Sequence, residues 1–144
     1  MTDFSGKWIL DRTRSSSPAD VLDVQGAGWF MKQAAAAVSL DVDITQTGSG
    51  EHTVITTRTI TGEQAMTIDG VEREYPRKLI GDSVFITAKW GPEETLIVHH
   101  RHSSGSWTQD GVWELSDAGK TRTQKIHVKG PQKEGDFAMI FTKA

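Results

Sequence analysis

The sequence predicts an all-β fold: an antiparallel up-and-down barrel of about ten strands, with a helix-turn-helix lid between the first two strands. Three observations predict it. Apolar and polar residues alternate through most of the chain, turn signals recur about every ten residues, and one segment, 21–38, has helical composition. A meander of this length favours closure, because an open sheet would leave edges and one face unprotected.

The strands follow from the alternation. In the segment 4–12, Phe4, Gly6, Trp8 and Leu10 share one face, and the aromatic pair is expected at the bottom of the barrel core. A flexible connection from Gly48 to Gly50 joins the next two strands, 40–45 and 52–60. Seven further strands are predicted at 64–69, 72–80, 83–90, 94–102, 106–115, 120–129 and 136–143.

The lid prediction rests on local signals. Pro18 suits the first position of a helix, the serines before it are able to cap that helix, and Asp20 places a negative charge in its first turn. Gly26 and Gly28 bracket a turn that needs a permissive backbone. The following segment, 29–38, is rich in strong helix formers and predicts a second helix.

Composition limits the function classes. A chain of 144 residues predicts one domain, 1–144, and the net charge of −3 without a basic stripe argues against nucleic acid as a partner. Cysteine is absent, which excludes disulfides and thiolate sites. No apolar leader and no segment of transmembrane length is present, so we expect a cytoplasmic protein without stable membrane insertion. We also expect a monomer. No motif indicates a cofactor.

Several motifs carry a family resemblance. The opening FSGKW, the Gly26-x-Gly28-Trp29 turn with its following Lys-Gln-x-Ala, and Lys89-Trp90 leading into Glu-Thr resemble the intracellular fatty-acid-binding proteins, the cytosolic lipid-binding branch of the calycins. Their order and spacing match over 4–70 and 83–102. The resemblance implies a barrel with a hydrophobic ligand in an internal cavity and the helical pair over a portal.

The resemblance also implies an arginine on a late strand and an Arg-x-Tyr pair on the last strand, which together bind a fatty-acid carboxylate. In an ungapped alignment, His99 replaces the first arginine, and Met139 and Phe141 replace the pair. Burying a carboxylate without a guanidinium partner is costly. We therefore predict a neutral or weakly polar ligand, such as a lipid, terpenoid or polyketide.

Parity and the family register predict which residues line the cavity. Alternate apolar residues of the strand 83–90 point inward, and on the next strand His99 and Arg101 are placed inward while His100 and His102 are placed outward. Trp29 and Met31 either line the portal or pin the lid to the rim. The predicted ligand contacts are Trp29, Met31, Val84, Ile86, Ala88, Trp90, Ile97, His99, Trp107, Trp113, Met139 and Phe141.

The run 99–102 leaves two functions open. Two histidines on one strand face without a third ligand predict a solvated strand end and no metal site. An inward His99 predicts either a hydrogen-bonding cavity wall or, with Arg101, the acid/base of a cofactor-independent isomerase or cyclase. A binding protein for a hydrophobic small molecule is the favoured prediction, and the enzyme is the alternative.

Overall fold

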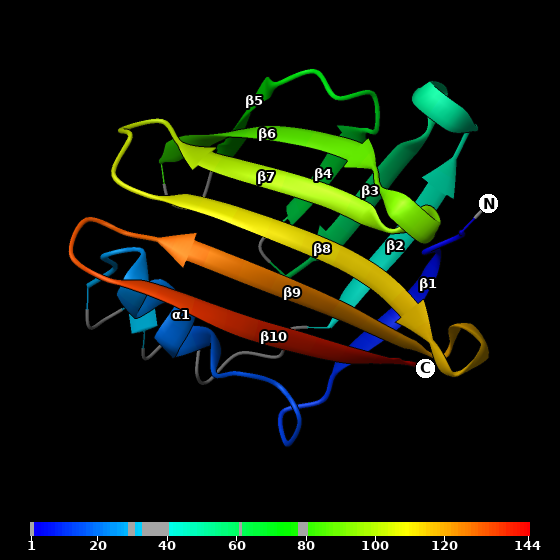
Figure 1. Ribbon diagram of the computed structural model, residues 1–144, viewed down its shortest axis with the longest axis horizontal. Coiled ribbons are helices and arrows are strands. Elements are labelled where there is room, and N and C mark those ends of the chain that lie inside the picture. The colour runs from blue at the N-terminus through cyan, green and yellow to red at the C-terminus, as the bar shows by residue number, and fades with distance from the viewer. Residues whose placement is uncertain (1, 29–30, 33–40, 61, 78–80) are drawn as a thin grey trace.

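Ten antiparallel strands and one short α-helix form the computed structural model, which describes residues 2–28, 31–32, 41–60, 62–77 and 81–144 (Figure 1). The predicted strands are all confirmed, with small changes of boundary. In chain order the elements are β1 (Gly6–Leu10), α1 (Pro18–Val24), β2 (Val42–Thr47), β3 (Val54–Thr59), β4 (Gly62–Thr67), β5 (Arg73–Arg77), β6 (Asp82–Trp90), β7 (Leu96–His102), β8 (Thr108–Ser116), β9 (Thr121–Lys129) and β10 (Glu134–Lys143). Single 3₁₀ turns at Gly50–His52, Pro92–Glu94 and Asp117–Gly119 connect some of them.

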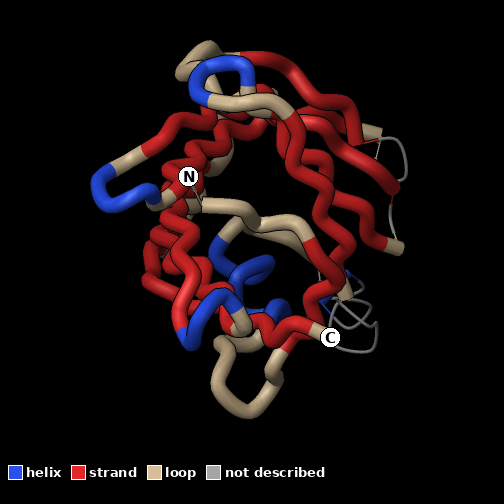
Figure 2. Tube along the Cα trace, turned by 90° about the vertical axis from the view of Figure 1, so that its right-hand side faces the viewer, coloured by secondary structure: helices blue, strands red, loops and turns tan. Residues whose placement is uncertain are grey.

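The strands make one sheet in the order β4-β3-β2-β1-β10-β9-β8-β7-β6-β5. Every strand except β4 and β5 pairs with both of its chain neighbours or, at the termini, through the β1–β10 ladder, so the sheet curves back on itself. Figure 2 shows the strands surrounding a common interior. Within the described residues no ladder joins β4 to β5, and the barrel is therefore nearly closed rather than sealed.

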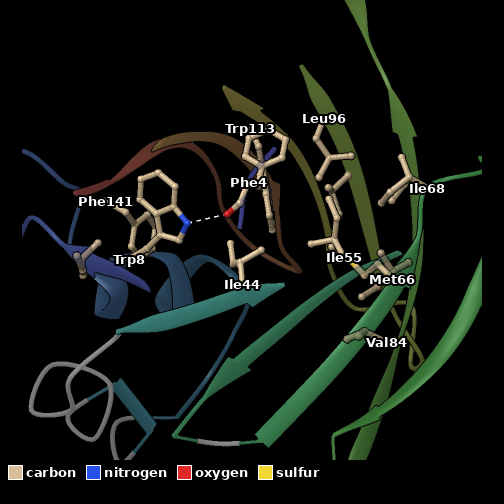
Figure 3. Packing of buried hydrophobic residues seen from close by; sticks show 14 of the residues in the cluster. Phe4, Trp8, Ile44, Ile55, Met66, Ile68, Val84, Leu96, Trp113 and Phe141 are labelled. Atoms are coloured by element: carbon tan, nitrogen blue, oxygen red, sulfur yellow. Dashed lines mark hydrogen bonds between the residues drawn. The ribbon is translucent and has the colours of Figure 1, made fainter. Parts of the chain in front are cut away.

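One end of the barrel is filled by the aromatic residues of the N-terminal segment (Figure 3). Phe4 and Trp8 are fully buried, as predicted, and the Trp8 indole Nε1 donates to the carbonyl oxygen of Phe4 at 2.8 Å. The Phe4 ring stacks on Trp90, with centroids 6.3 Å apart, and meets Trp113 edge-on at 5.8 Å. Such aromatic contacts bury large apolar areas and hold the end of the barrel shut.

Helix α1 covers the barrel beside β9 and β10 (Figure 1). It begins at Pro18 with Asp20 in its first turn, as predicted, but Ser17 at the N-cap makes no side-chain capping bond. Its apolar residues Val21 and Val24 pack against β9 and β10. The second predicted helix, 29–38, falls outside the described residues except for Met31 and Lys32, and it stays a prediction. No described helix has the length and hydropathy needed to span a bilayer.

Candidate ligand-binding site

Three strands turn their predicted residues toward the interior. Val84, Ile86 and Ala88 of β6 are buried in the core, and Trp90 packs against it partly buried. The other predicted inward residues outside β7 also belong to this core: Trp107, Trp113, Met139 and Phe141. Their placement agrees with the parity of the sequence on β6, β8 and β10.

The predicted register of β7 is wrong by one residue. Antiparallel partners share a sheet face, and the inward Ile86 pairs with His100, so His100 points inward and His99 points outward. The His99 side chain is 38% exposed, and its Nδ1 lies 2.6 Å from the Asp110 carboxylate. By the same parity Ile97 also faces outward, opposite Lys89.

Arg101, the other proposed catalytic residue, is also outside the barrel. Its guanidinium binds Glu72 at 2.9 Å and lies 4.3 Å from the centroid of the Phe85 ring, with 41% of the side chain exposed. An outer-surface ion pair between His99 or Arg101 and a carboxylate cannot act on a molecule inside the barrel. The inward placement of this proposed pair is therefore wrong.

The interior contains an arginine that is not among the predicted site residues. Arg122 of β9 is 1% exposed and sits between β8 and β10, where its strand partners are Leu115 and Phe141. Three aromatic rings surround its guanidinium carbon, with centroids at 4.2 Å for Phe141, 4.7 Å for Trp113 and 5.5 Å for Trp8. The cation thus lies at the aromatic end of the barrel.

The hydrogen bonds of Arg122 leave part of its guanidinium unsatisfied. Nη1 donates to the Gln124 side-chain oxygen, whereas Nε is shielded from solvent and has no hydrogen-bond partner among the described residues. No ion pair is found for it in the described part of the chain. Burial lowers the pKa of Arg122 to about 9, so the group remains a cation at pH 7. A buried cation with open donor capacity favours an anion as its partner.

A second polar group lies inside the barrel on β7 and β8. The register places His100 beside Gln109, whose side-chain oxygen accepts from Gln25 at the end of α1 at 3.1 Å. His100 Nδ1 is shielded, and no residue in the described part of the chain forms a hydrogen bond with it. Burial, followed by the charges of His99 and Arg77, lowers the pKa of His100 to about 4. The imidazole is therefore neutral at pH 7.

His102 also points inward, contrary to the prediction, and takes part in a network at the same end. Its Nε2 lies 2.7 Å from Asp82, which also accepts two bonds from Arg77. On the other side of the ring, Nδ1 lies 2.7 Å from the Ser104 hydroxyl and also accepts from the Ser104 backbone N–H at 3.2 Å. This network ties β5, β6 and β7 together. Among the described residues, no three or more acidic or histidine side chains are arranged to hold a metal ion.

Solved structures share this architecture. The REP1-NXSQ fatty acid transporter matches with a TM-score of 0.70 at 22% identity, covering 99% of this chain and 96% of that chain. Apo lipid-binding protein 8 of Caenorhabditis elegans matches with a TM-score of 0.73 at 16% identity, covering 98% of this chain and 95% of that chain. The chain has a fatty-acid-binding-protein-like fold. No family model and no curated protein matches the sequence.

Two of the predicted ligand contacts, Trp29 and Met31, belong to the predicted lid of this fatty-acid-binding-protein-like barrel. Trp29 falls outside the described residues. Met31 is described and is 39% exposed. The portal role of both residues stays a prediction.

The inward position of Arg122 was predictable from the sequence of β9. On β9 the residues Ile126 and Val128 mark the apolar face, and Arg122 and Gln124 share their parity. Extending that parity along the whole strand places the arginine inside. The family resemblance implied arginines only on β7 and β10, so the position on β9, which lies between β8 and β10, was not predicted.

Proposed function

We propose that this protein is a carrier that binds a long-chain hydrophobic carboxylic acid inside its barrel, with Arg122 as the partner of the carboxylate. The barrel interior supports the apolar part of the proposal, because most inward residues of β6, β8 and β10 belong to one hydrophobic core. Two proteins of the same fold, described as a fatty acid transporter and a lipid-binding protein, support the ligand class.

Arg122 is the observation that carries the proposal. The prediction of a neutral ligand depended on the lack of an inward arginine, and the buried guanidinium removes that premise. Aromatic rings compensate a cation only in part, by about 0.5–2 kcal/mol per ring contact. A carboxylate adds charge-assisted hydrogen bonds to the open guanidinium edge.

The isomerase or cyclase alternative has no comparable support. Its proposed acid/base, His99, and its proposed cation, Arg101, are paired with Asp110 and Glu72 on the outer surface. We therefore do not propose a reaction. The cytoplasmic location, the monomeric state and the exclusion of nucleic acid stay predictions from the sequence.

The test compares ligands that differ only at the head group. Delipidated protein is titrated at pH 7.4 with hexadecanoic acid, hexadecanol and methyl hexadecanoate, with tryptophan emission as the readout because Trp8 and Trp113 surround Arg122. We expect the acid to bind roughly 10- to 150-fold more tightly, which corresponds to about 1.5–3 kcal/mol for a charged hydrogen bond.

Two variants test whether the preference for the acid depends on Arg122. Arg122→Met should remove the preference for the acid and leave hexadecanol binding nearly unchanged. Arg58→Met is the matched control, because Arg58 is an exposed arginine paired with Glu63 on the barrel surface, and it should leave all three affinities unchanged. Equal binding of acid and alcohol by the unmodified protein, or an acid preference that survives Arg122→Met, would overturn the proposal.

A further inference from the structure

The described part of the chain contains two shielded side-chain polar atoms without a hydrogen-bond partner: Nε of Arg122 and Nδ1 of His100. Buried polar groups in folded proteins are nearly always satisfied, so each such atom calls for an explanation. A ligand with a polar group at each end explains both. An anionic head group at Arg122 would satisfy only the first of these atoms and would leave Nδ1 of His100 without a partner.

These two atoms belong to opposite ends of the barrel interior. On the inner face of β8, Leu115 is the strand partner of Arg122 and Gln109 is the strand partner of His100. The strand advances by six residue steps from Gln109 to Leu115, which corresponds to about 20 Å. Arg122 lies at the aromatic end, and His100 lies where Gln25 of the α1 C-cap reaches the interior.

The surroundings of His100 define what it recognises. Its neutral imidazole has one donor and one acceptor nitrogen, and its strand neighbours are the apolar Ile86 and the amide of Gln109. A carboxylate is a poor partner for an uncharged ring in this setting. A hydroxyl group fits, because it can donate to Nδ1 when this nitrogen is unprotonated and accept from it when it carries the proton.

We infer that the preferred ligand is a long-chain acid with a hydroxyl group at or near its far end, with the carboxylate at Arg122 and the hydroxyl at His100. This inference rests on the proposed function and names the ligand class more narrowly. The separation sets the length: an extended chain advances roughly 1.2 Å per bond, so about 20 Å takes about 17 bonds. A sixteen-carbon acid with a terminal hydroxyl has this span.

The test uses two pairs of acids. The first pair is hexadecanoic and 16-hydroxyhexadecanoic acid, and the second is dodecanoic and 12-hydroxydodecanoic acid, which is too short to reach both ends. In the long pair the hydroxyl should tighten binding roughly 2- to 12-fold, the value of one hydrogen bond. In the short pair it should weaken binding, because the hydroxyl is then buried without a partner.

Three variants assign the effect to His100. His100→Leu should reverse the preference in the long pair, and His100→Gln, which keeps a polar group at this position, should retain part of it. His99→Leu is the control on the outer face and should change nothing. Arg122→Met should weaken both long acids equally and leave the hydroxyl preference in place. Far-ultraviolet circular dichroism checks that each variant is folded.

The outcomes separate the two proposals. If the unmodified protein binds hexadecanoic acid but prefers it over the hydroxy acid, the inference is wrong and the carrier proposal stands. Binding of none of the four acids overturns both. A hydroxyl preference that persists in His100→Leu, or disappears in His99→Leu, overturns the assignment to His100.

Discussion

The guanidinium carbon of Arg122 lies 4.2 Å from the centroid of the Phe141 ring, inside a barrel whose other inward residues are mostly apolar. The strand register makes this contact, because Arg122 and Phe141 are direct partners on β9 and β10. Trp113 and Trp8 complete the surroundings of the cation. This arrangement buries a charge among aromatic rings, and burying an ion without an oppositely charged partner is costly.

The first prediction is that Arg122→Met stabilises the ligand-free protein. Methionine fills a similar volume without a charge, and replacing buried ionic groups by apolar ones is often stabilising by about 1–4 kcal/mol. Urea unfolding at pH 7 measures the change. Arg58→Met, an exposed control, should stay within about 0.5 kcal/mol of the parent protein. A less stable Arg122→Met protein would show that the aromatic rings alone compensate the cation.

A second prediction concerns Asp82, which joins three strands at the end of the barrel that contains His100. Arg77, and then His102, hold the pKa of Asp82 at about 2, so the carboxylate is charged at pH 7. Asp82→Asn removes the charge from these hydrogen bonds and should lower the free energy of unfolding by about 1.5–3 kcal/mol.

The control for Asp82→Asn is Glu63→Gln, which breaks the exposed pair with Arg58 on β3 and β4. Surface pairs contribute about 0–1 kcal/mol, so this variant should change stability little. Comparable losses in both variants, measured by urea unfolding, would mean that the Asp82 network is no more important than an ordinary surface pair.

The fold was predictable from the sequence because strand alternation is a local property. The inward orientation of Val84, Ile86 and Ala88 was predictable from their own strand alone, and all three are buried. The face of β7 was not predictable in this way, since its run of polar residues 99–102 has no apolar parity. Its face is set by the pairing with β6, which places His100 opposite Ile86. The alternation of β9 was enough to predict that Arg122 points inward. Its aromatic neighbours were not predictable in this way, because they come from three separate strands.

The third prediction tests how α1 docks on the barrel. A Cβ atom at Gly130, in the turn between β9 and β10, would collide with the backbone carbonyl oxygen of Val24. Gly130→Ala should therefore displace the end of α1 and lower the free energy of unfolding by about 1–3 kcal/mol, as overpacking typically does. Hydrogen exchange should be faster at the amides of α1 than in the parent protein.

Gly28→Ala provides the comparison for this variant, because a Cβ there has no neighbour within 4 Å among the residues that the structure describes. It should leave the exchange of α1 nearly unchanged. Unchanged protection of α1 in Gly130→Ala would show that the turn moves aside and that the close approach is not needed for docking.

The last prediction follows from the neutral state of His100. Burial lowers the pKa of His100 to about 4 in the folded protein, whereas an unfolded histidine titrates near 6.5. Between these values the unfolded state binds more protons, so this residue's contribution to stability is present above pH 6.5 and is lost as the pH falls toward 4. The parent protein should therefore lose about 2 kcal/mol more than His100→Gln between pH 7 and pH 5.

His127 gives the opposite sign and serves as the control for the pH experiment. Asp136, and then Glu134, raise the pKa of His127, so its contribution is present below pH 6.5 and is lost as the pH rises through the raised pKa. His127→Gln should therefore make the loss between pH 7 and pH 5 larger than in the parent protein. Urea unfolding at both pH values measures all three proteins. If His100→Gln loses as much as the parent protein, His100 is not shielded in the folded state, and its role as a buried contact for a ligand fails with that result.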